Sequence, residues 1–100
     1  MKICIISPAA SKDLNEIADY FASRNLDAGD RFVIAFERKC KYLIQFPNMG
    51  RSYSDLEESL RGVPVENYII LYRIVEQGVE IVRVVSGYRD LEELFSDSED

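Results

Sequence analysis

The strongest constraint on the fold is the stretch from Asn67 to Arg89, in which two apolar runs surround a short break. β-Branched and aromatic residues fill Tyr68–Val75 and Val79–Val85, as is typical of strands. The break, Glu76-Gln77-Gly78, contains the glycine that tight hairpin turns favour. Because both runs are almost wholly apolar, the pattern predicts a β-hairpin at the centre of a sheet.

The register of this hairpin decides which side chains share a face of the sheet. A two-residue turn at Gln77-Gly78 would place Arg73 opposite Val82. The face more suited to the core would then hold Tyr68, Ile70, Tyr72, Ile74, Val79, Ile81, Arg83 and Val85. The other would hold Ile69, Leu71, Arg73, Val75, Glu80, Val82, Val84 and Ser86. A three-residue turn would instead put Arg73 and Arg83 on one face, and the sequence leaves both registers open.

The residues before the hairpin predict a strand followed by two helices. Lys2–Ile6 has the β-branched content of a short strand. Ser7-Pro8 then begins a helix that runs to about Ser23, because serine is a good N-cap and proline suits the first helical position. Its apolar stripe consists of Ala10, Leu14, Ile17, Ala18 and Phe21.

The second helix is expected to run from about Ala28 to Gln45. Asn25 can end the first helix and Asp27 can cap the second, while Pro47 prevents its continuation. Its buried face is expected to hold Phe32, Ala35, Phe36, Cys40, Leu43 and Ile44. Its outer face is expected to hold Arg31, Arg38, Lys39 and Lys41. The short connection predicts an antiparallel helical hairpin.

The remaining segments complete an α+β pattern. Pro47 to Ser59 is rich in turn formers, and Leu60–Val65 contains Pro64, which predicts a strand near a sheet edge. A last helix is expected at residues 90–95, and residues 96–100 are expected to fray as an acidic tail. The order β-α-α-β-β-β-α predicts one domain, residues 1–95, with the helical hairpin on one face of a small, mainly antiparallel sheet.

Charge is distributed unevenly along the chain. Six of its eighteen acids lie between Asp90 and Asp100, which contains no base, so the other twelve balance the twelve Lys and Arg of the body. A neutral body can still present a local arginine patch to a partner. No apolar run reaches the roughly 20 residues of a membrane helix, and the start lacks a signal-peptide pattern. The sequence therefore predicts a cytoplasmic protein without a membrane partner.

The inventory of reactive side chains argues against most enzyme chemistry. The chain has no histidine, and its two cysteines, Cys4 and Cys40, are expected to be reduced core thiols. We therefore expect neither a metal site nor a cofactor. The arginines can grip phosphate or an acidic partner, but they are poor general bases. An exposed apolar patch rimmed by arginines is expected around Ile69 and Leu71, unless the loop of residues 47–59 covers it.

Four motifs extend over nearly all of residues 3–95: ISPAASKDLNEIADYF, QFPNMGRS, LRGVPVENYIILYRIV and IVRVVSGYRDLEELF. In order and spacing the chain resembles the RelE/ParE superfamily of toxins from type II toxin–antitoxin systems, and it is closer to the ParE branch. The resemblance implies a small α+β toxin that a cognate antitoxin holds inactive in a hetero-oligomer. ParE-like members poison DNA gyrase without being enzymes, whereas RelE-like members cut messenger RNA in the ribosome.

The resemblance also assigns roles to individual residues. Arg73 and Arg89 match positions where RelE-like ribonucleases hold active-site arginines, and Phe95 falls where they often carry a catalytic tyrosine. Since phenylalanine has no hydroxyl, Phe95 argues against ribonuclease activity. The candidate target-binding residues are Arg61, Arg73, Arg83, Tyr88 and Arg89. The candidate antitoxin-binding residues are Ile69, Leu71, Val82, Val84, Leu94 and Phe95.

The expected function is thus a ParE-like toxin that binds and inhibits DNA gyrase. Two alternatives stay open. One is a RelE-like ribosome-dependent messenger-RNA endoribonuclease that uses Arg73 and Arg89. The other is a decayed toxin that only binds an antitoxin.

Overall fold

The chain forms the predicted helical hairpin, and each of its two helices begins at a capping residue. In the computed structural model, which describes residues 1–87 and 91, α1 spans Pro8–Ala22 and α2 spans Leu26–Gln45. The Ser7 hydroxyl oxygen accepts a hydrogen bond from the Ala10 N–H at 3.1 Å. This contact confirms Ser7 as the cap of α1.

The cap of α2 differs from the sequence prediction. Asn25 has an extended backbone, and its side chain accepts a hydrogen bond from the Ala28 N–H at 3.1 Å. Asp27 is therefore not the cap, and the helix begins at Leu26 rather than Ala28. Asp27 lies in the first turn instead, where its negative charge interacts favourably with the positive end of the helix dipole.

Five strands form one mixed sheet in the order β1-β5-β4-β3-β2. Their bounds are Ile3–Ile6 for β1, Arg51–Ser52 for β2, Arg61–Val65 for β3, Tyr68–Val75 for β4 and Gly78–Ser86 for β5. β1 runs parallel to β5, whereas the other neighbours are antiparallel. The predicted α+β class and the interior hairpin are confirmed. The expected irregular loop contains two unexpected short elements, β2 and the 3₁₀ turn η1 at Pro47–Met49.

β3 lies next to the sheet edge, as its proline predicted. β2 pairs only with Arg61 and Gly62, so the rest of β3 has no strand on its outer side among the described residues. Pro64 falls in that unpaired part, where its missing N–H removes no bond to an outer neighbour. Within the described chain, no helix is long and apolar enough to cross a membrane.

The hairpin turn is two residues long, but it lies one residue earlier than predicted. Val75 pairs with Gly78, so Glu76 and Gln77 form the turn. Gly78 has φ +145°, and a Cβ there would collide with the Ile3 carbonyl oxygen. Only glycine therefore allows β1 to approach the start of β5 at this point.

A β-bulge in β5 changes which side chains reach the core. Tyr72 pairs with Ile81 while Leu71 pairs with Arg83, so Val82 is an extra residue between them. Beyond the bulge the alternation reverses, which neither predicted register included. Val84 lies in the helix-covered core and Val85 on the opposite face, so the faces predicted for these two residues were wrong.

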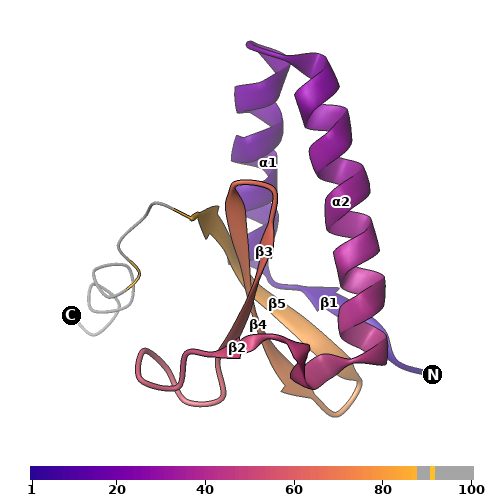
Figure 1. Cartoon of the computed structure of the whole chain (residues 1–100), viewed down its shortest axis with the longest axis vertical. Coiled ribbons are helices and arrows are strands. Elements are labelled where there is room, and N and C mark those ends of the chain that lie inside the picture. The colour runs from indigo at the N-terminus through magenta and orange to yellow at the C-terminus, as the bar shows by residue number, and fades with distance from the viewer. Residues whose placement is uncertain (88–90, 92–100) are drawn as a thin grey trace.

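The helical hairpin covers one face of the sheet, as Figure 1 shows. The core beneath it contains Ala10, Ile17, Phe32, Phe36, Leu43, Val63, Val65, Ile70, Tyr72, Val79, Ile81 and Val84. These include the predicted buried positions Phe32, Phe36 and Leu43 of α2.

The opposite face is covered by residues 53–60, called here the 53–60 loop. Leu60, Leu71 and Val85 form a second cluster with Tyr53, Leu56, Ile69, Val82 and Leu91. Leu71 is 0% exposed, so the expected open patch around it is wrong. The loop supplies the apolar side chains that cover it. Apart from Leu91, the predicted helix at residues 90–95 lies outside the described residues.

Candidate functional site

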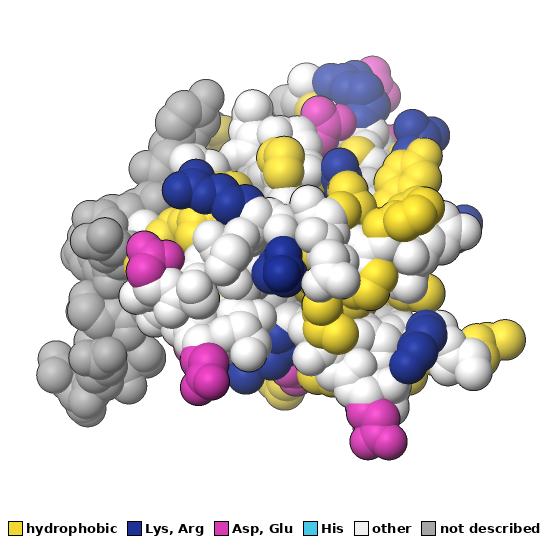
Figure 2. Space-filling view, turned by 60° about the horizontal axis from the view of Figure 1, so that its bottom comes forward, with side chains coloured by type: hydrophobic (Ala, Val, Ile, Leu, Met, Phe, Trp, Pro, Cys, Tyr) yellow, Lys and Arg dark blue, Asp and Glu magenta, His cyan; other side chains and the backbone are white. Residues whose placement is uncertain are grey.

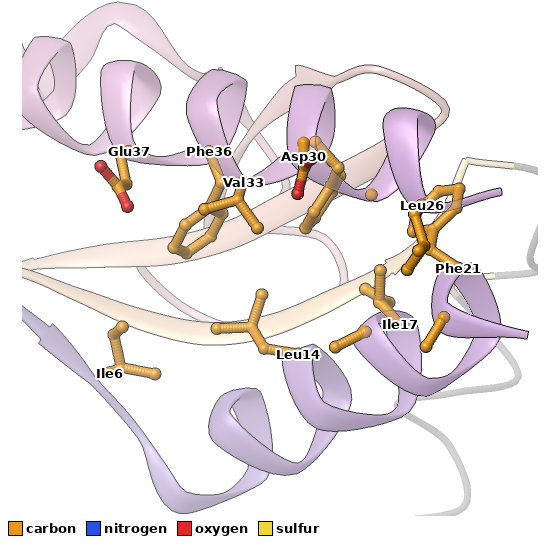
Figure 3. A pocket seen from close by; sticks show the side chains of 13 residues that line it. Ile6, Leu14, Ile17, Phe21, Leu26, Asp30, Val33, Phe36 and Glu37 are labelled. Carbon is orange, nitrogen blue, oxygen red and sulfur yellow. The ribbon is translucent and has the colours of Figure 1, made fainter.

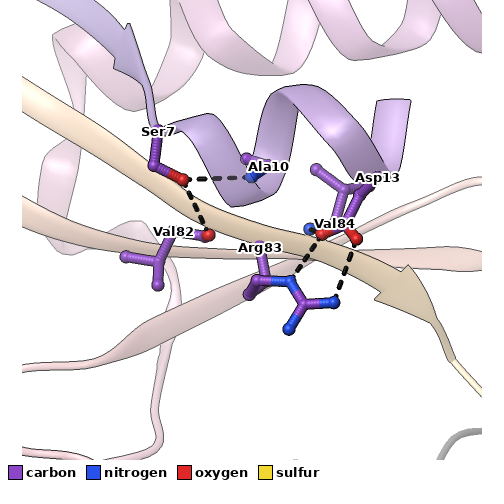
Figure 4. A network of polar contacts seen from close by, with 6 residues as sticks. All are labelled: Ser7, Ala10, Asp13, Val82, Arg83 and Val84. Atoms are coloured by element: carbon purple, nitrogen blue, oxygen red, sulfur yellow. Dashed lines mark hydrogen bonds and ion pairs between the residues drawn. The ribbon is translucent and has the colours of Figure 1, made fainter. Parts of the chain in front are cut away.

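Side chains of the α1 region complete β5 where β1 ends (Figure 4). The Ser7 N–H donates to the Ile81 carbonyl oxygen at 3.1 Å, and the Ser7 hydroxyl donates to the Val82 carbonyl oxygen at 2.9 Å. One oxygen of Asp13 accepts a hydrogen bond from the Val84 N–H at 2.9 Å. These contacts satisfy backbone groups that a longer β1 would otherwise pair.

The same carboxylate binds Arg83. Asp13 accepts bonds from Arg83 Nε at 2.7 Å and from a terminal guanidinium nitrogen at 3.0 Å. The hydrogen bond to Asp13 raises the pKa of the Arg83 guanidinium. Asp13 is only 8% exposed, so this is an ion pair at the boundary between core and surface. Arg83, a predicted target-binding residue, is thus engaged in holding α1 to β5.

Asp13 was not among the predicted site residues, although the sequence contains a signal for it. It lies three positions after Ala10 and four before Ile17, and all three are the buried residues of α1. An acid at helical spacing between two core positions indicates a buried partner. The partner itself could not be named, because the bulge in β5 determines where Arg83 lies.

Arg73, the second predicted arginine, holds the 53–60 loop. One terminal nitrogen donates to Glu57 Oε1 at 2.7 Å, and its Nε lies 3.8 Å from Glu80 Oε1. Among the described residues, this buried Nε has no hydrogen-bond partner. Arg73 therefore ties β4 to the loop that covers Leu71.

Arg61, the third predicted arginine, holds the turn around η1. One of its terminal nitrogens donates to the Gly50 carbonyl oxygen at 2.8 Å and to the Asn48 carbonyl oxygen at 3.3 Å. Buried Tyr72 supports the same turn: its hydroxyl donates to the Pro47 carbonyl oxygen at 2.6 Å and accepts from the Gly50 N–H at 3.0 Å. Burial raises the pKa of the Tyr72 hydroxyl, while the Gly50 bond and the charge of Arg61 act in the opposite direction.

The three candidate arginines that the structure describes, Arg61, Arg73 and Arg83, are thus bound to different elements and do not form one phosphate-binding cluster. Figure 2 shows Lys and Arg side chains scattered over the face that comes forward from the bottom of Figure 1. Tyr88, Arg89, Leu94 and Phe95 lie outside the described residues. Residues 1–87 and 91 contain no group of three or more His, Cys, Asp or Glu side chains that could hold a metal ion.

An apolar groove of about 450 Å³ lies between α1 and α2 (Figure 3). Its apolar lining includes Ile6, Leu14, Ile17, Phe21, Leu26, Val33 and Phe36. Leu26 is 68% exposed and Val33 is 50% exposed, which is unusual for large apolar side chains that adjoin a core. The carboxylates of Asp30 and Glu37 also line the groove, both from α2.

The packing at the closed end of the hairpin explains how the two helices meet. A Cβ at Gly29 would lie 2.9 Å from the Phe21 Cβ, so glycine permits close contact between α2 and α1 there. Periodicity correctly assigned Ile17 and Phe36 to buried faces. It could not reveal that these residues form the floor of a groove, because periodicity does not give the separation of two helices.

Comparisons with known proteins agree with this architecture. The family described as the ParE toxin of the type II toxin–antitoxin system parDE matches residues 4–91. The chain belongs to the ParE toxin family. Toxin ParE3 of Caulobacter vibrioides is 39% identical over 49 residues, which cover 49% of this chain and 49% of that protein. The alignment therefore spans about half the length of this ParE relative.

A solved structure extends the likeness to the fold. The structure titled chromosomal ParDE TA system from P. aeruginosa matches with a TM-score of 0.71 at 19% identity, covering 86% of this chain and 96% of that chain. The ParE-family assignment and the predicted superfamily therefore agree.

Proposed function

We propose that this ParE-family protein is the toxin of a type II toxin–antitoxin system, that it inhibits DNA gyrase by binding it, and that a cognate antitoxin neutralises it in the cytoplasm. The observation that supports a binding partner most directly is the open groove between α1 and α2. An apolar groove with exposed Leu26 and Val33 can gain stability by burying the apolar face of another segment.

The antitoxin segment proposed for this groove is an amphipathic helix. Helix-in-groove recognition places apolar side chains at helical spacing into a hydrophobic channel. Asp30 and Glu37 give the channel a negative border, so basic residues are expected beside the apolar stripe of the antitoxin. Ile69 and Val82, which are half-buried on the second face of the sheet, stay candidates for further antitoxin contacts. Leu94 and Phe95, outside the described residues, also stay candidates. Leu71 and Val84 lie inside the protein, at 0% and 2% exposure.

The ion pairs of Arg73 and Arg83 within the protein favour gyrase binding without catalysis over ribonuclease action. Arg73 and Arg83 each donate to a carboxylate of the protein itself. The chain also lacks histidine as a proton donor or acceptor. The proposed gyrase contacts are Arg61, Arg73, Arg83, Tyr88 and Arg89, which would act as binding rather than catalytic residues.

A supercoiling assay with purified gyrase tests the proposal. The full chain is expected to inhibit supercoiling and to stabilise cleaved DNA, and stoichiometric antitoxin is expected to relieve both effects. A parallel translation reaction is read by toeprinting to detect cuts in ribosome-bound messenger RNA. Unaffected gyrase at large toxin excess, or cuts at the ribosomal A site, would overturn the gyrase assignment.

A further inference from the structure

The second half of α2 has a basic surface on the side where the helix packs on β3. Arg38, Lys39 and Tyr42 border a hollow of about 250 Å³ between the helix and residues 64–66. Arg38 and Tyr42 also border a second hollow, which Lys41 lines as well. Arg38, Lys41 and Tyr42 are exposed. These four residues, Arg38, Lys39, Lys41 and Tyr42, are called here the basic face of α2.

The three cations of the basic face have no ionic partner within the described part of the chain. The ion pairs of the described residues are made by Arg73 and Arg83 instead. Glu37 lines the second hollow but points into the groove between α1 and α2 (Figure 3). Glu66 is the one acid that lines the first hollow. The basic face is therefore net positive, and it attracts an acidic segment.

The chain contains such a segment directly after Leu91. Residues 92–100, which lie outside the described residues, contain five acids and no base, in a chain of net charge −6. The body of the chain is close to neutral, so the negative charge is concentrated where it can pair with the uncompensated cations of α2. The acids of this segment are Glu92, Glu93, Asp97, Glu99 and Asp100.

The end of β5 lies close enough to the basic face for this segment to reach it. The Gly87 N–H donates to the Asn67 carbonyl oxygen at 2.9 Å, and Asn67 follows Glu66 of the first hollow. Leu91 then packs on the second cluster, on the other face of the sheet. Nine extended residues span about 30 Å, whereas a helix with its side chains is about 10 Å wide. The segment is thus long enough to pass the edge of β3 and contact α2.

We propose that residues 92–100 fold back past the edge of β3 and dock on the basic face of α2 in the same molecule. Single exposed ion pairs are weak, but five carboxylates on one tether act together. The tether gives the segment an effective concentration of about millimolar, so at micromolar protein it competes better than the same segment of a second copy. The docked segment covers the basic face and keeps other anionic partners from it.

A zero-length carbodiimide, which joins a carboxylate to an amine in direct contact, tests the proposal on the purified full chain. Lys39 and Lys41 lie on the basic face, whereas Lys12 is exposed on α1, which packs on β5. Without a docking site, residues 92–100 would meet Lys12 as readily as α2. Mass spectrometry of the monomer is expected to find these residues joined to Lys39 or Lys41 at least about tenfold more often than to Lys12. High salt is expected to remove the preference.

Two matched variants test the role of charge. Arg38→Gln keeps both lysines of the basic face but removes one cation, and it is expected to lower the yield at these lysines about two- to fivefold. Arg31→Gln removes an exposed arginine of the same helix that lines neither hollow, and it is expected to leave the yield unchanged.

Three results would overturn the proposal. The first is a yield at Lys12 equal to or above that at the lysines of α2, or no link to α2 at all. The second is an equal yield for Arg38→Gln and the wild type. The third is linkage of residues 92–100 to α2 only at the mass of a dimer, which would assign the segment to a second copy. None of these outcomes depends on whether gyrase is the toxin target.

Discussion

At the residue scale, the Asp13 carboxylate makes two kinds of contact with β5: one with its backbone and one with a side chain. The carboxylate accepts the Val84 N–H, which a longer β1 would bind, and it neutralises Arg83. A side chain of α1 thereby accepts a backbone hydrogen bond that a neighbouring strand would otherwise accept. Asp13 therefore holds α1 against β5 together with the Ser7 contacts to Ile81 and Val82.

Replacing Asp13 with alanine is expected to lower the free energy of unfolding by about 3 kcal/mol. The change leaves a buried Val84 N–H without an acceptor and a partly buried Arg83 without a counter-charge. Urea denaturation measures the effect. Asp19→Ala, an exposed acid of the same helix, is the matched control and is expected to change stability by no more than about 0.5 kcal/mol. Equal losses in both variants would show that the Asp13 network does not stabilise the fold.

Tyr72→Phe is expected to change both stability and its dependence on pH. Loss of the hydroxyl bonds to Pro47 and Gly50 should lower the free energy of unfolding at neutral pH by about 1–2 kcal/mol. Burial raises the pKa of Tyr72 in the folded state. Its contribution is therefore complete below the ordinary tyrosine pKa of about 10 and is lost as pH rises through the raised value.

Denaturation curves recorded from neutral to alkaline pH measure this effect. The wild type is expected to lose stability more steeply above pH 10 or so than Tyr72→Phe, because the variant has no ionisable group at this position. Parallel curves for the two proteins would contradict the prediction. Tyr68 is unchanged in both, so its own raised pKa cancels in the comparison.

At the scale of elements, local signals predicted the helices and the central hairpin well. Ser7 and Pro8 predicted the start of α1, and Pro47 predicted the end of α2, because capping and proline geometry act within a few residues. The bulge at Val82 had no such local signal. It depends on where β1 ends and where α1 reaches β5, both of which are tertiary contacts. The bulge affected the prediction of the candidate site most, because it reversed the faces on which Val84 and Val85 lie.

The ion pair between Arg73 and Glu57 belongs to the same scale, because it fastens one loop to the sheet. Both side chains are about a third exposed, at 33% and 39%, so the pair is expected to add less than about 1 kcal/mol to global stability. Glu57→Gln is expected to accelerate hydrogen exchange in the 53–60 loop while leaving β4 protected.

Exposed Glu58 supplies the matched control for this prediction. Glu58→Gln removes the same charge from the loop without touching Arg73, and exchange in the 53–60 loop is expected to stay unchanged. If both variants accelerate exchange equally, loop charge rather than the specific pair sets the protection.

At the scale of the whole molecule, two neighbouring residues of α2 differ in whether they line the groove. Val33 lines the groove between the helices, whereas Ile34 lies outside that groove, on a more polar surface of α2. Both are at least half exposed, at 50% and 58%, so neither is needed for the core. They therefore form a natural pair of variants for mapping a partner.

Val33→Glu is expected to weaken antitoxin binding at least about tenfold, or 1.4 kcal/mol, because a carboxylate would be buried in the apolar channel. Ile34→Glu is expected to leave the affinity unchanged. Calorimetric titration with a cognate antitoxin measures the affinity of both variants. Equal affinities for the Val33 variant and the wild type would move the antitoxin to another surface.

The parallel contact between β1 and β5 has a consequence for how the protein is made. β1 is synthesised first, yet its only strand partner in the described structure is the last strand of the sheet. While the chain is still attached to the ribosome, the helical hairpin can form, but the sheet that supports it cannot close until β5 has left the exit tunnel. A toxin with this topology therefore completes its sheet only after β5 has been synthesised.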